Sequence, residues 1–172
     1  MIWRMKRLKK LKTLIFSMIK VGCMGFGGGN ALIPVIEEEA VKDKKLVFAT
    51  KTSMLKVVDG GEFDVAKRTV AATKLQDNDE VISVEIIREQ KQVILQSAEG
   101  YFLRFGLEEV PEKKKSAVGV RGMKLSDKDH VEAVYYTLAA MPDPDIVYKD
   151  KHVELQRIKP QHRDSKGTKL RL

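Results

Sequence analysis

The chain has 172 residues, which is enough for one domain of ordinary size or for a small domain with an appendage. An excess of Lys and Arg over Asp and Glu gives a net charge of +8, which favours a polyanionic partner, either nucleic acid or an anionic membrane surface. The single cysteine, Cys23, excludes an intramolecular disulfide, and nothing in the composition indicates an oxidising compartment.

The first 44 residues differ in kind from the rest of the chain. A basic run from Arg4 to Lys12 contains no acid and precedes an apolar, glycine-rich stretch, Leu14–Ile36, that is long enough to cross a bilayer. We expect an apolar helix here, and Gly27-Gly28-Gly29 leaves a bent or re-entrant segment as the alternative. By the positive-inside rule the N-terminus would stay in the cytoplasm. A secretory signal peptide also fits the basic start, but no A-x-A-like cleavage site closes the stretch.

The apolar stretch resembles the opening of chromate transporter family proteins. The resemblance covers about 40 residues and rests on a "K-I-G…F-G-G-G-x-A-x-I-P-x-I-E" pattern, matched by Lys20-Val21-Gly22 and by residues 25–37. It implies membrane contact through residues 14–36, as in a membrane-embedded fragment of a chromate or anion transporter. That family has many further membrane segments, and no apolar run beyond Val41 is long enough to supply one. The sequence therefore excludes a complete transporter.

From Lys45 onward, short apolar runs alternate with turn residues. The runs are rich in Val, Ile, Tyr and Phe, and turn sequences such as Asp77-Asn78-Asp79 and Asp127-Lys128-Asp129 separate them. The predicted strands are residues 46–50, 54–58, 81–87, 93–97, 101–105, 131–138, 146–148 and 152–158. We therefore expect a mainly β fold.

A unit of about fifty residues occurs at least twice in tandem. The segment Lys74–Val84 recurs as Lys124–Val134 with six of eleven positions identical, and a looser third copy runs from Ile146 to Leu155 and ends at residues 167–170. A period near 45 to 50 with about four strands per unit predicts a partial propeller-like array of two to three four-stranded blades. The predicted divisions are 45–91 for the first blade, 92–140 for the second, and 141–172 for a partial final blade with a basic tail.

The repeated turn has the pattern K-L-x-D-x-D-x-V. Its two aspartates are expected to accept hydrogen bonds from backbone N–H groups, while Leu75 and Leu125 anchor the turn from the core side. Calcium binding by these carboxylates is the alternative. It lacks a third ligand at a suitable spacing.

The repeat resembles the C-terminal domain of the A subunits of bacterial DNA gyrase and topoisomerase IV over about 125 residues. Residues 101–105 and 118–125 are similar to the blade signature "G-Y-x-x-R-F…G-V-x-G-x-K-L…D", and Glu62-Phe63, residues 68–75 and residues 163–170 are similar to further parts of such domains. The resemblance implies a β-pinwheel, a disc of blades whose basic rim bends or wraps duplex DNA, within an ATP-dependent type IIA topoisomerase. Two to three blades are fewer than the five or six of that family, which indicates a truncated array. The gyrase "Q-R-R-G-G-x-G" box is absent, which favours either the topoisomerase IV type or loss of the blade that carried the box.

The resemblance also implies non-specific contacts to DNA phosphates through cations in or beside the loops before each K-L turn. Lys74 and Lys124 are the strongest candidates because they recur at the same blade position. The β portion carries only +3 of the net charge, since residues 1–44 carry +5, which is modest for a DNA-wrapping surface. A blade-type protein-interaction module is a further alternative, because incomplete blades expose edges for strand addition. The predicted DNA-binding residues are Lys67, Arg68, Lys74, Lys113, Lys114, Lys115, Arg121, Lys124, Lys166 and Lys169.

No catalytic constellation is present in the sequence. None of the tyrosines follows an arginine, as the DNA-cleaving tyrosine of the topoisomerase family does, and the histidines lack metal-ligand spacing. We expect a module without enzymatic activity, cofactor, metal or small-molecule substrate, whose partners are duplex DNA and other topoisomerase subunits. It would be cytoplasmic and nucleoid-associated if the β portion dominates, and membrane-bound if residues 14–36 insert. The two unlike segments are interpreted as a fusion of reading frames near residues 42–46.

Overall fold

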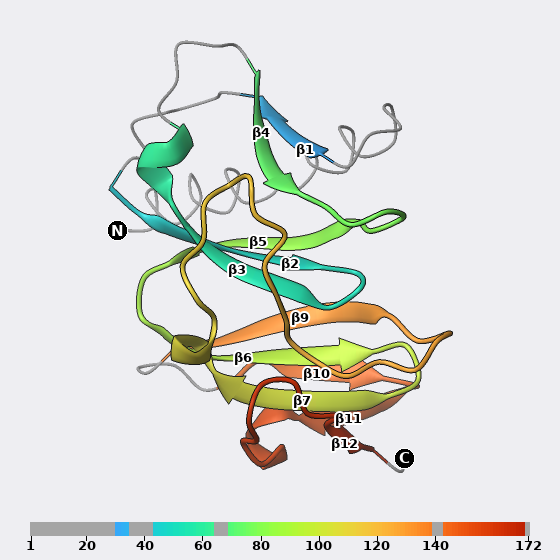
Figure 1. Ribbon diagram of the computed structural model, residues 1–172. Coiled ribbons are helices and arrows are strands. Elements are labelled where there is room, and N and C mark those ends of the chain that lie inside the picture. The colour runs from blue at the N-terminus through green and yellow to red at the C-terminus, as the bar shows by residue number, and fades with distance from the viewer. Residues whose placement is uncertain (1–29, 35–42, 64–68, 139–142, 171–172) are drawn as a thin grey trace.

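The computed structural model describes residues 30–34, 43–63, 69–138 and 143–170 (Figure 1). Most of the predicted apolar helix, including the glycine cluster, therefore lies outside the described residues. Its described part, Asn30–Pro34, is not helical: it forms strand β1, which pairs antiparallel with β4 (Thr69–Lys74). Pairing supplies backbone hydrogen bonds to a short segment that ends at a proline, where a helix interior would be disfavoured. Within the described ranges, no helix is long and apolar enough to cross a membrane.

Two four-stranded antiparallel sheets and a hairpin make up most of the described chain (Figure 1). The first sheet, blade one, has the order β5 (Val81–Ile87), β2 (Lys45–Thr50), β3 (Met54–Asp59) and β8 (Val120–Arg121). The second, blade two, has the order β9 (Val131–Leu138), β6 (Gln90–Ser97), β7 (Tyr101–Gly106) and β12 (Thr168–Lys169). The hairpin consists of β10 (Asp145–Tyr148) and β11 (Lys151–Glu154). The predicted mainly β array, with two four-stranded blades and part of a third, is confirmed.

Each blade takes its fourth strand from the following unit. Strand β8 lies beyond β7 in the chain, yet it pairs with β3 of blade one, and β12 lies beyond the hairpin, yet it pairs with β7 of blade two. The sequence pattern does not predict these strands, because each has only two residues and is too short to show an alternation of apolar and polar residues. The exchange ties consecutive units together.

The predicted strand 152–158 is wrong beyond Glu154. Leu155–Arg157 forms a single 3-10 turn, η4, as do Leu107–Glu109 (η3) and Gly60–Phe63 (η2) after the corresponding strands of the earlier units. In η3 and η4 the closing N–H, of Val110 or Ile158, donates to the carbonyl of the first turn residue. The turn buries its leading leucine, so an apolar run of strand-like composition folds as a turn.

The main core lies between the two blades. It joins buried side chains from β2 and β3 with those from β6 and β7, and Met123, from the segment after β8, is fully buried in it. The edge strands β5 and β9 are also joined: the hydroxyls of Ser83 in β5 and Tyr136 in β9 are 3.2 Å apart and hydrogen-bonded. Burial raises the pKa of the Tyr136 phenol. Stacking thus hides one face of each sheet against its neighbour, as expected for a repeat array.

The repeated turn has the same geometry in both units. Oδ1 of Asp79 accepts hydrogen bonds from the backbone N–H groups of Thr52, at 2.9 Å, and Glu80, at 2.8 Å. Oδ1 of Asp129 does the same for Glu99, at 3.0 Å, and His130, at 2.9 Å. The predicted capping is confirmed for the second aspartate of each turn. In the part of the chain that the structure describes, no group of three or more His, Cys, Asp or Glu could hold a metal ion.

Candidate nucleic-acid interface

One edge of each blade collects positive charge. We call this the β8/β12 edge, and it comprises residues 113–124 and 161–170, the swapped strands with their flanking loops. Residues 161–170 contain Arg163, Lys166 and Lys169 against one acid, Asp164. The strands at the opposite edge, β5 and β9, contain no Lys or Arg and one glutamate each. Residues 113–124 contain five cations and no acid, namely Lys113, Lys114, Lys115, Arg121 and Lys124.

Two glycines let the swapped strands approach the blades. Gly119 and Gly167 have φ of +108° and +82°, in the region that L side chains rarely adopt. A Cβ on Gly119 would lie 2.6 Å from the carbonyl oxygen of Leu55, and one on Gly167 would lie 2.6 Å from that of Phe102. Leu55 and Phe102 occupy the same place in β3 and β7, so the two glycines perform the same task.

By the same equivalence, Lys169 holds the position in blade two that Arg121 holds in blade one. Arg121 pairs with Met54 at the start of β3, and Lys169 pairs with Tyr101 at the start of β7. The residue that follows each strand also forms an equivalent bond. The N–H of Gly122 donates to the carbonyl of Ser53, and the N–H of Leu170 donates to the carbonyl of Gly100. Although the K-L pattern aligns Lys169 with Lys124 in the sequence, Lys169 therefore stands where Arg121 stands in the preceding unit.

Lys74 and Lys124 each make a backbone hydrogen bond to the loop of the following unit. The backbone N–H of Lys74 donates to the carbonyl of Lys115 at 3.1 Å, and that of Lys124 donates to the carbonyl of Ser165 at 2.9 Å. Each bond reaches into the loop of the following unit, and both lysine side chains are exposed. Among the other predicted cations, Lys113 and Lys114 are also exposed. Lys67 and Arg68 lie outside the described residues.

Two predicted cations already have protein partners. The Lys115 ammonium donates to the carbonyl of Glu62 at 2.6 Å, and its backbone N–H donates to the Glu62 carboxylate at 2.8 Å. The Arg121 guanidinium makes two bonds to Asp164, Nε to Oδ1 at 2.5 Å and Nη2 to Oδ2 at 3.1 Å. This pairing lowers the pKa of Asp164 and raises the pKa of Arg121. Lys115 and Arg121 thus hold loops together, and the charge of Arg121 is compensated by Asp164.

Lys166 and Lys169 converge on one aromatic ring. Their Nζ atoms lie 4.7 Å and 5.2 Å from the ring centroid of Tyr101, within the range of cation–π attraction. Both lysines are exposed, and Tyr101 is half-buried at the start of β7. Both ammonium groups therefore lie at the surface around one ring, where they are available to an anion such as a phosphate.

Arg104, the arginine of the "G-Y-x-x-R-F" signature, serves the fold. Its Nη1 donates to Asp143 at 2.7 Å and to the carbonyl of Leu155 at 3.1 Å, and its Nε donates to Gln92 at 2.6 Å. Both charged side chains of the ion pair are largely buried. The signature arginine therefore fastens blade two to the third unit.

Sequence reasoning missed Lys56, which lies in β3 and is 1% exposed. Its Nζ donates to three carbonyls in the loop before β8, at 3.2 Å to Lys114, 2.8 Å to Lys115 and 2.6 Å to Ala117. Burial lowers the pKa of Lys56 to about 8, against a smaller opposing effect of Glu62. The only signal in the sequence is one lysine within an apolar strand, which does not distinguish a buried ammonium from an exposed one.

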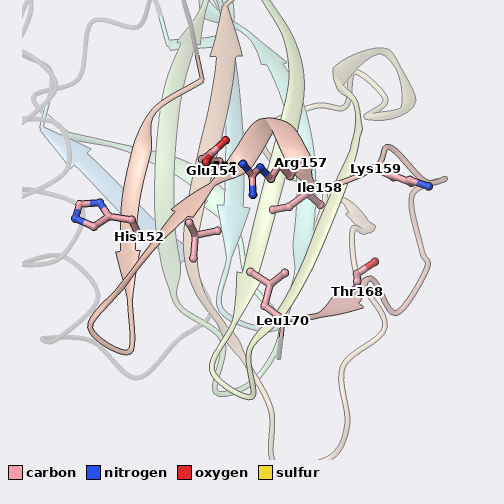
Figure 2. Close-up of a pocket in the computed structure, with 8 residues that line it drawn as sticks. His152, Glu154, Arg157, Ile158, Lys159, Thr168 and Leu170 are labelled. Carbon is pink, nitrogen blue, oxygen red and sulfur yellow. Dashed lines mark ion pairs between the residues drawn. The ribbon is translucent and has the colours of Figure 1, made fainter. Parts of the chain in front are cut away.

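A pocket of about 420 Å³ lies beside the hairpin (Figure 2). Val153, Ile158 and Leu170 give it an apolar lining, and Figure 2 shows His152 and Lys159 pointing away from the other labelled side chains. The carboxylate in its lining, Glu154, pairs with Arg157 at 3.0 Å. The carboxylate of the lining is thus engaged in an ion pair, and the lining contains no cysteine or serine.

Comparison with known proteins gives one family. The family model described as the DNA gyrase C-terminal domain, beta-propeller, matches residues 44–88 and 91–137. The DNA gyrase A protein of Klebsiella oxytoca is 35% identical over 104 residues, which is 59% of this chain and 12% of that protein. Its counterpart from Lawsonia intracellularis is 33% identical over 92 residues, 53% of this chain and 11% of that protein. The chain thus spans about a tenth of the length of these relatives.

Solved structures agree on the fold. A DNA gyrase A C-terminal domain is similar with a TM-score of 0.62 at 27% identity, covering 74% of this chain and 43% of that one. The C-terminal domain of a DNA topoisomerase IV has a TM-score of 0.62 at 21% identity, covering 73% and 41%. The resemblance to a chromate transporter stays a prediction, and the residues that carry it lie mostly outside the described ones.

Proposed function

The chain belongs to the family of DNA gyrase C-terminal β-propeller domains, and on that premise we propose that its β8/β12 edge binds duplex DNA through the phosphate backbone. The observation that carries the proposal is the separation of charge. The β8/β12 edge holds eight Lys or Arg against one acid, whereas β5 with its flanking turns, residues 75–89, holds one against five, and β9 with its preceding turn, residues 125–138, holds one against three. Phosphate contacts release condensed counterions and read no base sequence, so binding is sequence-tolerant and sensitive to salt.

The exposed lysines of this edge make the contacts. Lys166 and Lys169 contribute most, because both are exposed and both are positioned by the Tyr101 ring. Arg121 and Lys115 contribute less, because Asp164 and Glu62 already engage them. Lys67 and Arg68 stay predictions from the sequence. Four further exposed lysines extend the surface across the units, namely Lys74, Lys113, Lys114 and Lys124.

We further propose that the module bends or wraps DNA for a type IIA topoisomerase and has no catalytic activity of its own. The relatives that support this are whole gyrase A proteins, of which the chain spans about a tenth, and similarity extends to gyrase and topoisomerase IV domains alike. DNA cleavage and ATP dependence would belong to other domains and subunits of such an enzyme. The module would then act in the cytoplasm at the nucleoid.

A salt series on matched charge variants tests the DNA contact. The full chain is titrated with a short fluorescent duplex at several salt concentrations from about 50 to 200 mM, and log K is plotted against log salt. The double variant Lys166→Gln/Lys169→Gln should lower the magnitude of the slope by about 1.8, or 0.9 for each lost contact. The control Arg88→Gln/Lys91→Gln, in the β5–β6 connection and at the start of β6, removes the same charge and should leave the slope unchanged. Absence of binding at the lowest salt, or equal losses in both variants, would refute the proposal.

A further inference from the structure

A buried ammonium organises the loop that carries Lys113 and Lys114. All three hydrogens of the Lys56 ammonium are used, since it bonds the carbonyls of Lys114, Lys115 and Ala117. These carbonyls belong to one short loop, so their common donor draws the loop backbone inward. The side chains of Lys113 and Lys114 remain exposed on the same loop.

Blade two shows that the fold does not require this lysine. The residue at the same place in β7 is Leu103, which follows Phe102 as Lys56 follows Leu55, and it is fully buried among apolar side chains. There the following loop is held by Arg163, which donates to the carbonyls of Glu109 and Arg121. Because burying a charge carries a large desolvation cost, an aliphatic side chain would be the simpler choice for stability alone.

We propose that Lys56 is a positioning residue for DNA binding, which orders the loop 113–117 so that Lys113 and Lys114 face the phosphates. The inference rests on the proposed function of the β8/β12 edge. An ordered loop loses less conformational entropy on binding than a free one, so the same two ammonium groups bind more tightly.

The surroundings of Lys56 support the same role. Glu62, from η2, accepts the Lys115 N–H through its carboxylate and the Lys115 ammonium through its carbonyl, so it fixes the loop from the other side. The Glu62 charge also favours the protonated Lys56. From β2, the Phe48 ring lies with its centroid 5.9 Å from Nζ. The loop is thus held between one buried cation and one carboxylate.

The proposed role of Lys56 predicts a pH dependence of DNA affinity. The pKa of Lys56 is lowered to about 8, so the ammonium loses its proton in mildly alkaline solution. A neutral amine has two hydrogens for three carbonyls, and at least one carbonyl then loses its donor. The contribution of Lys56 to DNA affinity should therefore fall as the pH rises through about 8, while the DNA phosphates keep their charge.

The test compares Lys56→Met with Leu103→Met in the full chain. Lys56→Met should weaken binding to a short duplex about 5- to 10-fold, from the preorganisation of two side chains, and Leu103→Met should leave the affinity unchanged. In a Lys113→Gln/Lys114→Gln background, Lys56→Met should have no further effect, because the ordered groups are absent. The ratio of wild-type to Lys56→Met affinity should shrink above about pH 8. If Lys56→Met does not fold, Lys56→Gln, which keeps two donor hydrogens, takes its place.

Three results would overturn the role of Lys56: unchanged affinity in the folded variant, an undiminished effect in the double-Gln background, or an affinity ratio independent of pH. Amide hydrogen exchange of residues 113–117 separates this role from the DNA-binding proposal. Faster exchange in Lys56→Met with no DNA binding by the wild type would refute the proposed function and confirm the ordering of the loop. Unchanged exchange would refute the ordering itself.

Discussion

Blade one and blade two have the same backbone features and differ in one buried side chain. Both close with the same aspartate-capped turn, accept a strand from the next unit, and place a left-handed glycine against the carbonyl of Leu55 or Phe102. At the buried position after that residue, however, blade one has Lys56 and blade two has Leu103. The capped turn, the strand from the next unit and the glycine at positive φ are therefore common to both blades. The buried residue at the position of Lys56 and Leu103 can be either charged or apolar.

The largest expected effect tests the shared strand exchange. Gly119→Ala and Gly167→Ala should each lower the free energy of unfolding by about 2 to 3 kcal/mol, because the added Cβ meets backbone oxygen at a positive φ. Gly106→Ala is the matched control, since its φ of −68° is ordinary and its neighbour is the movable carboxylate of Glu108. Urea unfolding followed by far-UV circular dichroism measures all three. A mild effect at Gly119 or Gly167 would mean that the swapped strand does not approach its blade closely.

A smaller effect tests whether the two turns are equivalent. Asp79→Ala and Asp129→Ala each remove an acceptor for two backbone N–H groups and should cost about 1 to 2 kcal/mol. Asp77→Ala and Asp127→Ala, at the first aspartate of each turn, serve as controls and should cost clearly less. Chemical denaturation provides the values. Costs that differ widely between Asp79 and Asp129 would break the comparison of the blades.

The contact between the blades at the β5/β9 edge should contribute less again. Tyr136→Phe removes one side of the hydrogen bond to Ser83 and should cost about 1 kcal/mol. A double-mutant cycle with Ser83→Ala isolates the coupling energy. Additive losses would show that the two hydroxyls act independently and that the blades are joined by apolar packing alone.

A pH dependence of stability separates the interiors of the two blades. The pKa of Lys56 is lowered from 10.5 in an exposed lysine to about 8, so between these values the unfolded chain binds more protons at this site. Its contribution to stability is therefore fully present above about pH 10.5 and is lost as the pH falls through about 8. The difference in free energy of unfolding between the wild type and Lys56→Met should rise over this window, whereas Leu103→Met should show no such trend. A constant difference would mean that the pKa of Lys56 is not lowered.

Most of the fold follows from local sequence. The longer strands and the K-L-x-D-x-D turn can be predicted because they depend on apolar runs and turn residues that are close together in the sequence. Strands β8 and β12 are not readable, because only the edge of the preceding blade makes two residues into a strand. The boundaries at 91/92 and 140/141 stay predictions, since each sheet includes a strand from the next unit.

The candidate interface was only partly predictable. Counting cations identifies Lys113, Lys114, Lys124, Lys166 and Lys169, but it cannot show that Asp164 engages Arg121 or that one tyrosine ring gathers two lysines. It also overlooks Lys56, whose partners are carbonyls about sixty residues away in the chain. Such partners depend on how the units stack, which no local pattern encodes.

The reactivity of individual lysines toward acetylation, with and without a short duplex, tests DNA binding by the β8/β12 edge most directly. Mass spectrometry of the full chain at low salt should show protection of Lys113, Lys114, Lys124, Lys166 and Lys169, and little change at Lys91 in β6. Protection at Lys91 equal to that on the edge, or no protection on the edge while DNA is bound, would contradict the account.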